Sequence, residues 1–133
     1  MASAKNEKKR ILIVEDDEDM REIYREMFEN KGSKYEIETV MDARLGFKKL
    51  VESKFDFVIL DIIMEPMSGD TFFATMKGSE ELKDVPVIIV SVLDPEDLEW
   101  QIKGAKKIDF LRKPVTEEQL FEKIENFTAG KET

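Results

Sequence analysis

Two apolar segments of this chain end in acidic side chains. Ile11–Val14 runs directly into Glu15 and Asp16, and Phe57–Leu60 runs directly into Asp61. Short apolar segments of this kind are typical of buried strands, so these carboxylates stand at strand ends. Carboxylates held close together repel each other, and a bound cation relieves that repulsion. We therefore expect one anionic pocket that binds a cation and can offer a nucleophilic oxygen to a phosphoryl group.

Two more polar residues follow apolar segments in the same way. Ser91 comes directly after Val85–Val90, and Lys113 lies just past Ile108–Leu111. In parallel α/β sheets, ligands bind outside the carboxyl ends of the strands. We therefore expect Ser91 and Lys113 at the same edge of the sheet as the acidic residues, in a single site.

The elements that must position this site alternate along the chain. Five strand-like segments, at 10–14, 35–40, 55–61, 85–90 and 108–111, alternate with five segments whose apolar residues recur at helical spacing. The expected inward faces of these helices are Met20, Ile23, Tyr24, Met27 and Phe28; Ala43, Phe47, Leu50 and Val51; Phe72, Phe73 and Met76; Leu98, Ile102 and Ala105; and Leu120, Ile124 and Phe127. Such alternation implies right-handed crossovers and a parallel sheet with helices on both faces. Segment 35–40 alternates polar and apolar residues, which suits an edge strand.

Capping residues mark the expected helix ends. Asp42 is suited to an N-cap, and Asp94-Pro95 combines an N-cap with Pro at the first helical position. Thr116–Gln119 is a capping box that opens the last helix. Asp17 is favoured at a helix start by the macrodipole, and Gly32 falls just past the end of that helix.

The bulk composition excludes several classes of function. The 133 residues carry a net charge of −9, which argues against nucleic acid or an anionic membrane as a direct partner. The longest apolar runs are too short to insert across a membrane. Cys is absent, so disulfides and thiolate metal sites are excluded, and a reducing, cytoplasmic location is expected. His is also absent, which excludes Ser-His and Cys-His catalysis and an internal phosphohistidine donor.

Taken in order, these features resemble the receiver domain of two-component response regulators. The resemblance covers nearly the whole chain and rests on these motifs: Ile11–Asp17; Asp61 with Met64 and Gly69; Ser91; and Phe110–Pro114. Asp61 and Ser91 are 30 residues apart, and Ser91 and Lys113 are 22 apart, which are usual intervals for that family. The resemblance implies a flavodoxin-like, doubly wound (βα)5 fold whose five parallel strands have the order 2-1-3-4-5.

The resemblance also implies how the acidic residues act. Asp61 would accept the phosphoryl group as an aspartyl phosphate. Mg²⁺ would be bound directly by Asp16, Asp61 and the backbone carbonyl of Ile63. Glu15 aligns with a position that is often Asp, and it would reach the metal through a bound water.

The remaining site residues would carry the response to phosphorylation. Ser91 would donate a hydrogen bond to a phosphoryl oxygen, and Lys113 would place a positive charge against it. A cis peptide bond before Pro114 would aim the Lys113 ammonium inward. Movement of Ser91 toward the pocket would let the ring of Phe110 turn inward. The surface formed by the fourth helix, the last strand and the last helix would then change its affinity for partners by a population shift.

A receiver of this kind is expected to work with other proteins. Its phosphoryl donor would be a histidine kinase or a histidine phosphotransfer protein, and its downstream target would be another, unknown protein. A phosphorylation-linked homodimer is also compatible with the resemblance. Residues 1–9 would be a flexible lead-in, 10–128 the receiver domain and 129–133 a short tail, with no output domain visible. Such a domain catalyses its own phosphorylation and dephosphorylation and is not a turnover enzyme.

Two alternatives stay open, a binding module and a phosphatase, and the residues argue against a third, a cofactor binder. A binding module independent of phosphate could keep the same fold. A haloacid-dehalogenase-like phosphatase would need a second Asp at the position of Ile63. A flavodoxin-like cofactor binder would need a phosphate loop where the acidic cluster stands.

Within the receiver interpretation, Ile63 and Leu93 occupy the two positions that tune dephosphorylation. Both are apolar and cannot orient water, so slow loss of phosphate is expected.

Overall fold

The computed structural model describes residues 8–61, 74–92 and 107–128. The strands are β1 (Lys9–Val14), β2 (Tyr35–Val40), β3 (Phe57–Asp61), β4 (Val87–Ser91) and β5 (Ile108–Arg112). The helices are α2 (Glu18–Glu29), α3 (Ala43–Glu52) and α6 (Glu117–Thr128), with a 3-10 turn, η1, at Gly32–Lys34. Residues 74–77 are also helical.

The five strands form one parallel sheet in the order β2-β1-β3-β4-β5. This is the order implied by the resemblance, so the expected fold is confirmed. β2 lies at an edge, as its alternating pattern predicted. β3 and β4 are buried along their whole lengths, and β1 is buried from Ile11 to Val14. Such continuous apolar strands are typical of a parallel sheet covered on both faces.

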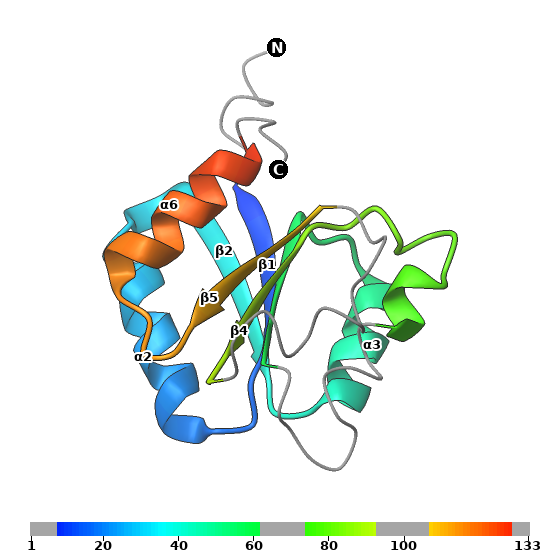
Figure 1. The fold of residues 1–133 in the computed structure, drawn as a ribbon, viewed down its shortest axis with the longest axis horizontal. Coiled ribbons are helices and arrows are strands. Elements are labelled where there is room, and N and C mark those ends of the chain that lie inside the picture. The colour runs from blue at the N-terminus through cyan, green and yellow to red at the C-terminus, as the bar shows by residue number, and fades with distance from the viewer. Residues whose placement is uncertain (1–7, 62–73, 93–106, 129–133) are drawn as a thin grey trace.

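Helices cover both faces of the sheet (Figure 1). On one face, α2 and α6 pack Tyr24, Phe28 and Phe121 against alternate residues of the central strands. On the other face, α3 packs Ala43 and Leu50 against the residues in between. Because side chains alternate along a strand, each central strand contributes to both apolar clusters.

The predicted caps hold the helix starts. Asp17 accepts a hydrogen bond from the backbone N–H of Asp19, and Asp42 accepts one from Leu45. Thr116 and Gln119 exchange two hydrogen bonds of 3.1 Å, which is the predicted capping box. α2 ends at Glu29, and Gly32 beyond it has a φ of +68°, a conformation that favours glycine.

Some details of the sequence interpretation were wrong. Ile23 and Val51 are exposed, although both were expected on inward faces. On each helix the buried stripe is narrower than the apolar spacing indicated, and these two side chains lie at its margin. The third and fourth strands begin at Phe57 and Val87, each two residues later than expected. Met76 is buried as predicted, while the helix expected from Asp94 falls outside the described residues.

In the part of the chain that the structure describes, no helix has both the length and the apolar character needed to cross a membrane.

Candidate functional site

Strand register brings the first two acidic residues together. β1 and β3 are neighbours, and Val14 is paired with Leu60, so Glu15 and Asp61 are the next residues along two adjacent strands. The backbone N–H of Glu15 donates to the carbonyl of Val40, which extends the β1–β2 pairing by one residue. The two carboxylates therefore meet at the carboxyl edge of the sheet, as the sequence predicted.

Asp16 completes a group of three carboxylates. Glu15, Asp16 and Asp61 each offer an oxygen atom within 4.8 Å of the others. Glu15 and Asp61 are buried, with exposed fractions of 1% and 6%, whereas Asp16 is exposed. Hard divalent cations prefer carboxylate oxygens, and Mg²⁺ commonly keeps several waters. Two buried oxygens and one facing solvent therefore fit a partly hydrated divalent cation.

Lys113 reaches the same carboxylates from the end of β5. Its Nζ lies 3.1 Å from Asp61 Oδ2 and 3.4 Å from Glu15 Oε1. Its backbone N–H donates to the carbonyl of Ser91 at 2.8 Å, which fixes the turn after β5 against the end of β4. The peptide bond between Lys113 and Pro114 is cis.

The burial of this charge cluster changes its acidity. Burial, and then the nearby charge of Asp61, raise the pKa of Glu15 to about 7, and the Lys113 ammonium only partly opposes this. Burial alone would lower the pKa of Lys113, but the charges of Asp61 and Glu15 raise it, so the ammonium stays protonated. The single ammonium of Lys113 does not balance the charge of three carboxylates, so a second cation at the site would be favourable.

Two contacts to Glu15 were not predicted from the sequence. Arg21 Nη1 donates to the backbone carbonyl of Glu15 at 2.8 Å, and the backbone N–H of Asp17 donates to Glu15 Oε2 at 3.2 Å. The position of Arg21, one helical turn after the N-cap Asp17, was the feature of the sequence that could have indicated its contact with Glu15. Both contacts hold the segment between β1 and α2 around the acidic group.

Of the other predicted site residues, the structure describes Ser91 and Phe110. Ser91 is buried at the end of β4, at the same edge of the sheet. Phe110 is partly buried and packs against the apolar cluster on the α3 face. Ile63 lies outside the described residues. Its carbonyl as a metal ligand therefore stays a prediction, as does the switch role of Phe110.

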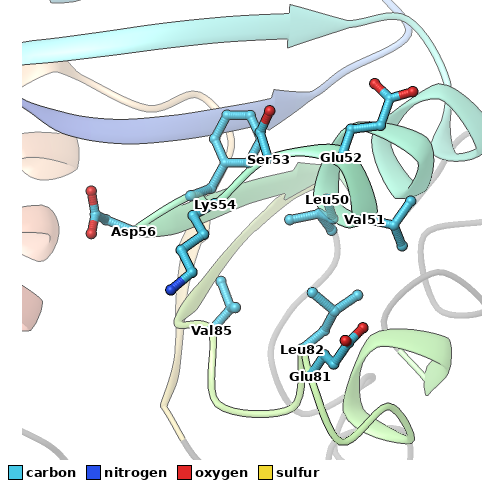
Figure 2. Close-up of a pocket in the computed structure, with 10 residues that line it drawn as sticks. Leu50, Val51, Glu52, Ser53, Lys54, Asp56, Glu81, Leu82 and Val85 are labelled. Atoms are coloured by element: carbon cyan, nitrogen blue, oxygen red, sulfur yellow. The ribbon is translucent and has the colours of Figure 1, made fainter.

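A separate hollow lies at the opposite edge of the sheet. It has a volume of about 570 Å³, and its lining includes Ser53–Asp56, which precede β3, and Val85, which precedes β4 (Figure 2). Its apolar lining also includes Leu50, Val51 and Leu82, and its charged lining includes Glu52 and Glu81. This hollow lies at the amino ends of the strands, far from the acidic group, so we assign no part of the chemistry to it.

Known proteins resemble this chain along most of its length. A family model described as the response regulator receiver domain matches residues 11–125. The transcriptional regulatory protein RprY of Bacteroides fragilis is 32% identical over 122 residues, which cover 90% of this chain and 49% of that protein. The sensor histidine kinase TmoS of Ectopseudomonas mendocina is 27% identical over 122 residues, which cover 92% of this chain and 12% of that protein. The chain thus spans less than half the length of these curated relatives.

Solved structures agree with the match to the family model. A CheY-like response regulator receiver domain protein from Methanospirillum hungatei superimposes with a TM-score of 0.83 at 25% identity, covering 94% of this chain and 97% of that one. The signal receiver domain of a histidine kinase from Syntrophus aciditrophicus gives a TM-score of 0.80 at 29% identity, covering 92% and 91%. With the matched family model, the parallel sheet and the acidic group at its carboxyl edge, the chain belongs to the response regulator receiver domain family.

Proposed function

We propose that this chain receives a phosphoryl group on Asp61 from a phosphohistidine of a partner protein, with Mg²⁺ bound at Glu15, Asp16 and Asp61. Phosphoryl acceptance is the general role of receiver domains, and relatives of this chain include sensor histidine kinases and response regulators. The observation that carries the proposal is the position of Asp61. It is a buried carboxylate that contacts Lys113 and lies within reach of two further carboxylates.

The side chains present can perform the transfer. An oxygen of the Asp61 carboxylate attacks phosphorus, a P–O bond forms, and the P–N bond to the donor imidazole breaks. The Lys113 ammonium, 3.1 Å from Asp61, then lies against the negative charge of the acyl phosphate. Glu15, Asp16 and Asp61 would hold Mg²⁺, which when bound would supply positive charge to the phosphoryl oxygens. Residues 1–133 contain no His, so the proposed phosphohistidine donor lies outside this sequence.

Ser91 and Phe110 support a route from the site to partner binding. Ser91 stands at the end of β4, and Phe110 lies in the neighbouring strand β5, paired with Ile89. A hydrogen bond from Ser91 to the phosphoryl group would favour one of two positions of the Phe110 ring. The surface around β5 and α6 would then change its affinity for a downstream protein, as a shift between existing states.

Intact-mass measurement tests the phosphoacceptor. We expect the chain to gain one phosphoryl group when incubated with acetyl phosphate and Mg²⁺, and to gain none when the metal is chelated. Asp61→Asn should abolish the gain. Asp42→Asn is a matched control, because Asn also caps helices and Asp42 lies outside the acidic group. An unmodified wild-type chain, or an Asp61→Asn chain that still gains the group, would reject the proposal in favour of a phosphate-independent module or another acceptor.

A further inference from the structure

The hydroxyl of Tyr24 has no hydrogen-bond partner in the part of the chain that the structure describes. Its side chain is 1% exposed, and its hydroxyl is the buried side-chain oxygen for which no hydrogen-bond partner is found among residues 8–61, 74–92 and 107–128. An unsatisfied buried hydroxyl costs about 1–3 kcal/mol. Phenylalanine would supply the same ring without this cost, so the hydroxyl calls for an explanation other than packing.

The path of α2 directs this hydroxyl toward the acidic group. α2 begins at Glu18, just beyond the end of β1, and therefore starts at the carboxyl edge of the sheet. Long side chains on a helix lean back toward its start, so the Tyr24 ring leans toward that edge.

Strand alternation places the acidic residues above Tyr24. The ring packs in the same cluster as Ile13 and Ile59, on the face covered by α2 and α6. Two residues further along each strand, on that same face, stand Glu15 and Asp61. Consistent with this placement, burial and then the charges of Glu15 and Asp61 raise the pKa of Tyr24, so its hydroxyl keeps its proton and can act as a donor.

We propose that Tyr24 is a positioning residue for Glu15: its hydroxyl donates a hydrogen bond, directly or through one buried water, that holds the Glu15 carboxylate in place when a divalent cation binds. This inference rests on the proposed function, because it takes the acidic group as the cation site. In the structure, Glu15 Oε1 faces Lys113 at 3.4 Å and Oε2 accepts from Asp17. A cation that interacts with either oxygen changes these contacts. Among the described residues, the Tyr24 hydroxyl is the buried side-chain donor that has no partner. Groups that orient a metal ligand typically change metal affinity about 10- to 100-fold when removed.

The second tyrosine provides a matched control. Tyr35 is also buried, but it is the first residue of β2 and so lies at the amino ends of the strands. The centroid of its ring is 5.5 Å from that of Phe28. Tyr24→Phe and Tyr35→Phe therefore remove the same atom at opposite ends of one layer. Isothermal titration with MgCl₂ gives the Kd of the wild type and of each variant, and chemical unfolding in chelator gives their stability.

We expect Tyr24→Phe to weaken Mg²⁺ binding more than about threefold while its free energy of unfolding without metal is unchanged or higher. Tyr35→Phe should bind Mg²⁺ like the wild type. A Kd for Tyr24→Phe within about threefold of the wild-type value would overturn the inference and leave the proposed function intact. A wild-type chain that binds no Mg²⁺ would overturn both.

A spectroscopic measurement on the wild-type chain gives a result that does not depend on the stability of the variants. The chain contains two tyrosines, so 3-fluorotyrosine labelling gives two fluorine resonances, assigned with the two Phe variants. Saturating Mg²⁺ should shift the Tyr24 resonance and leave that of Tyr35 in place. A Tyr24 resonance that does not respond to Mg²⁺ would contradict the inference even if Tyr24→Phe weakened binding.

Discussion

At the scale of single residues, Glu15 is a carboxyl group whose surroundings oppose its negative charge. Burial and Asp61 raise its pKa to about 7, so the folded chain holds a proton there more tightly than the unfolded chain, where the value is about 4.5. Between these two pKa values, binding of a proton to Glu15 stabilises the folded state. The free energy of unfolding therefore falls as the pH rises from about 4.5 to 7. We predict that Glu15→Gln is more stable than the wild type above pH 7 by about 1–3 kcal/mol, and that this advantage disappears near pH 4.5.

Urea unfolding of both chains in chelator, across that pH range, checks this prediction. Glu26→Gln is a suitable control, because Glu26 lies exposed on α2. Its stability difference from the wild type should stay small and nearly independent of pH. A constant difference between Glu15→Gln and the wild type from pH 4.5 to 8 would show that the carboxylate is not strained by its burial.

The sequence predicted which residues gather at the site better than how they contact one another. Glu15, Asp61 and Lys113 could be placed at one edge because strand ends and parallel pairing follow from apolar segments and their alternation. The contact of Lys113 with Glu15 depends on strand register and on the turn after β5, which no local pattern specifies. The unused hydroxyl of Tyr24 was equally invisible, because helical spacing identifies it only as a core residue.

At the scale of elements, apolar spacing identified most strands and helices, but strand order came from the resemblance and not from any local pattern. Spacing also overestimated the buried faces, since Ile23 and Val51 sit where a helix meets solvent. Caps were predicted more reliably because their hydrogen bonds are local. Asp42 and the pair Thr116 and Gln119 act on N–H groups three residues away or closer.

The capping box of α6 is expected to contribute measurably to stability. Its two hydrogen bonds hold the start of a helix that buries Leu120, Phe121 and Ile124 against the sheet. Thr116→Ala should lower the free energy of unfolding by about 1 kcal/mol, and Thr116→Ser, which keeps the hydroxyl, should cost much less. Urea denaturation of the two variants separates these cases. Equal losses for Ala and Ser would mean that the methyl group of Thr116, and not its hydroxyl, is what matters.

At the scale of the whole molecule, the chain gathers buried negative charge at the carboxyl ends of two strands whose preceding residues are apolar and buried. The net charge is −9, and two of the buried polar residues are the carboxylates of Glu15 and Asp61. Burying like charges side by side opposes folding, and a cation that binds only the folded state offsets that cost. The acidic edge should therefore link the stability of the whole domain to divalent metal.

This linkage predicts a metal-dependent melting temperature. Mg²⁺ at ten times its Kd should stabilise the wild type by about 1.4 kcal/mol, which raises the Tm by roughly 3–5 °C for a domain of this size. Asp61→Asn removes one of the three carboxylates, so its Tm should respond much less to Mg²⁺. NaCl at matched ionic strength separates site binding from general screening of the −9 charge. If NaCl raised the Tm of both chains as much as MgCl₂ did, the stabilisation would come from screening, and the three carboxylates would not act as a specific cation site.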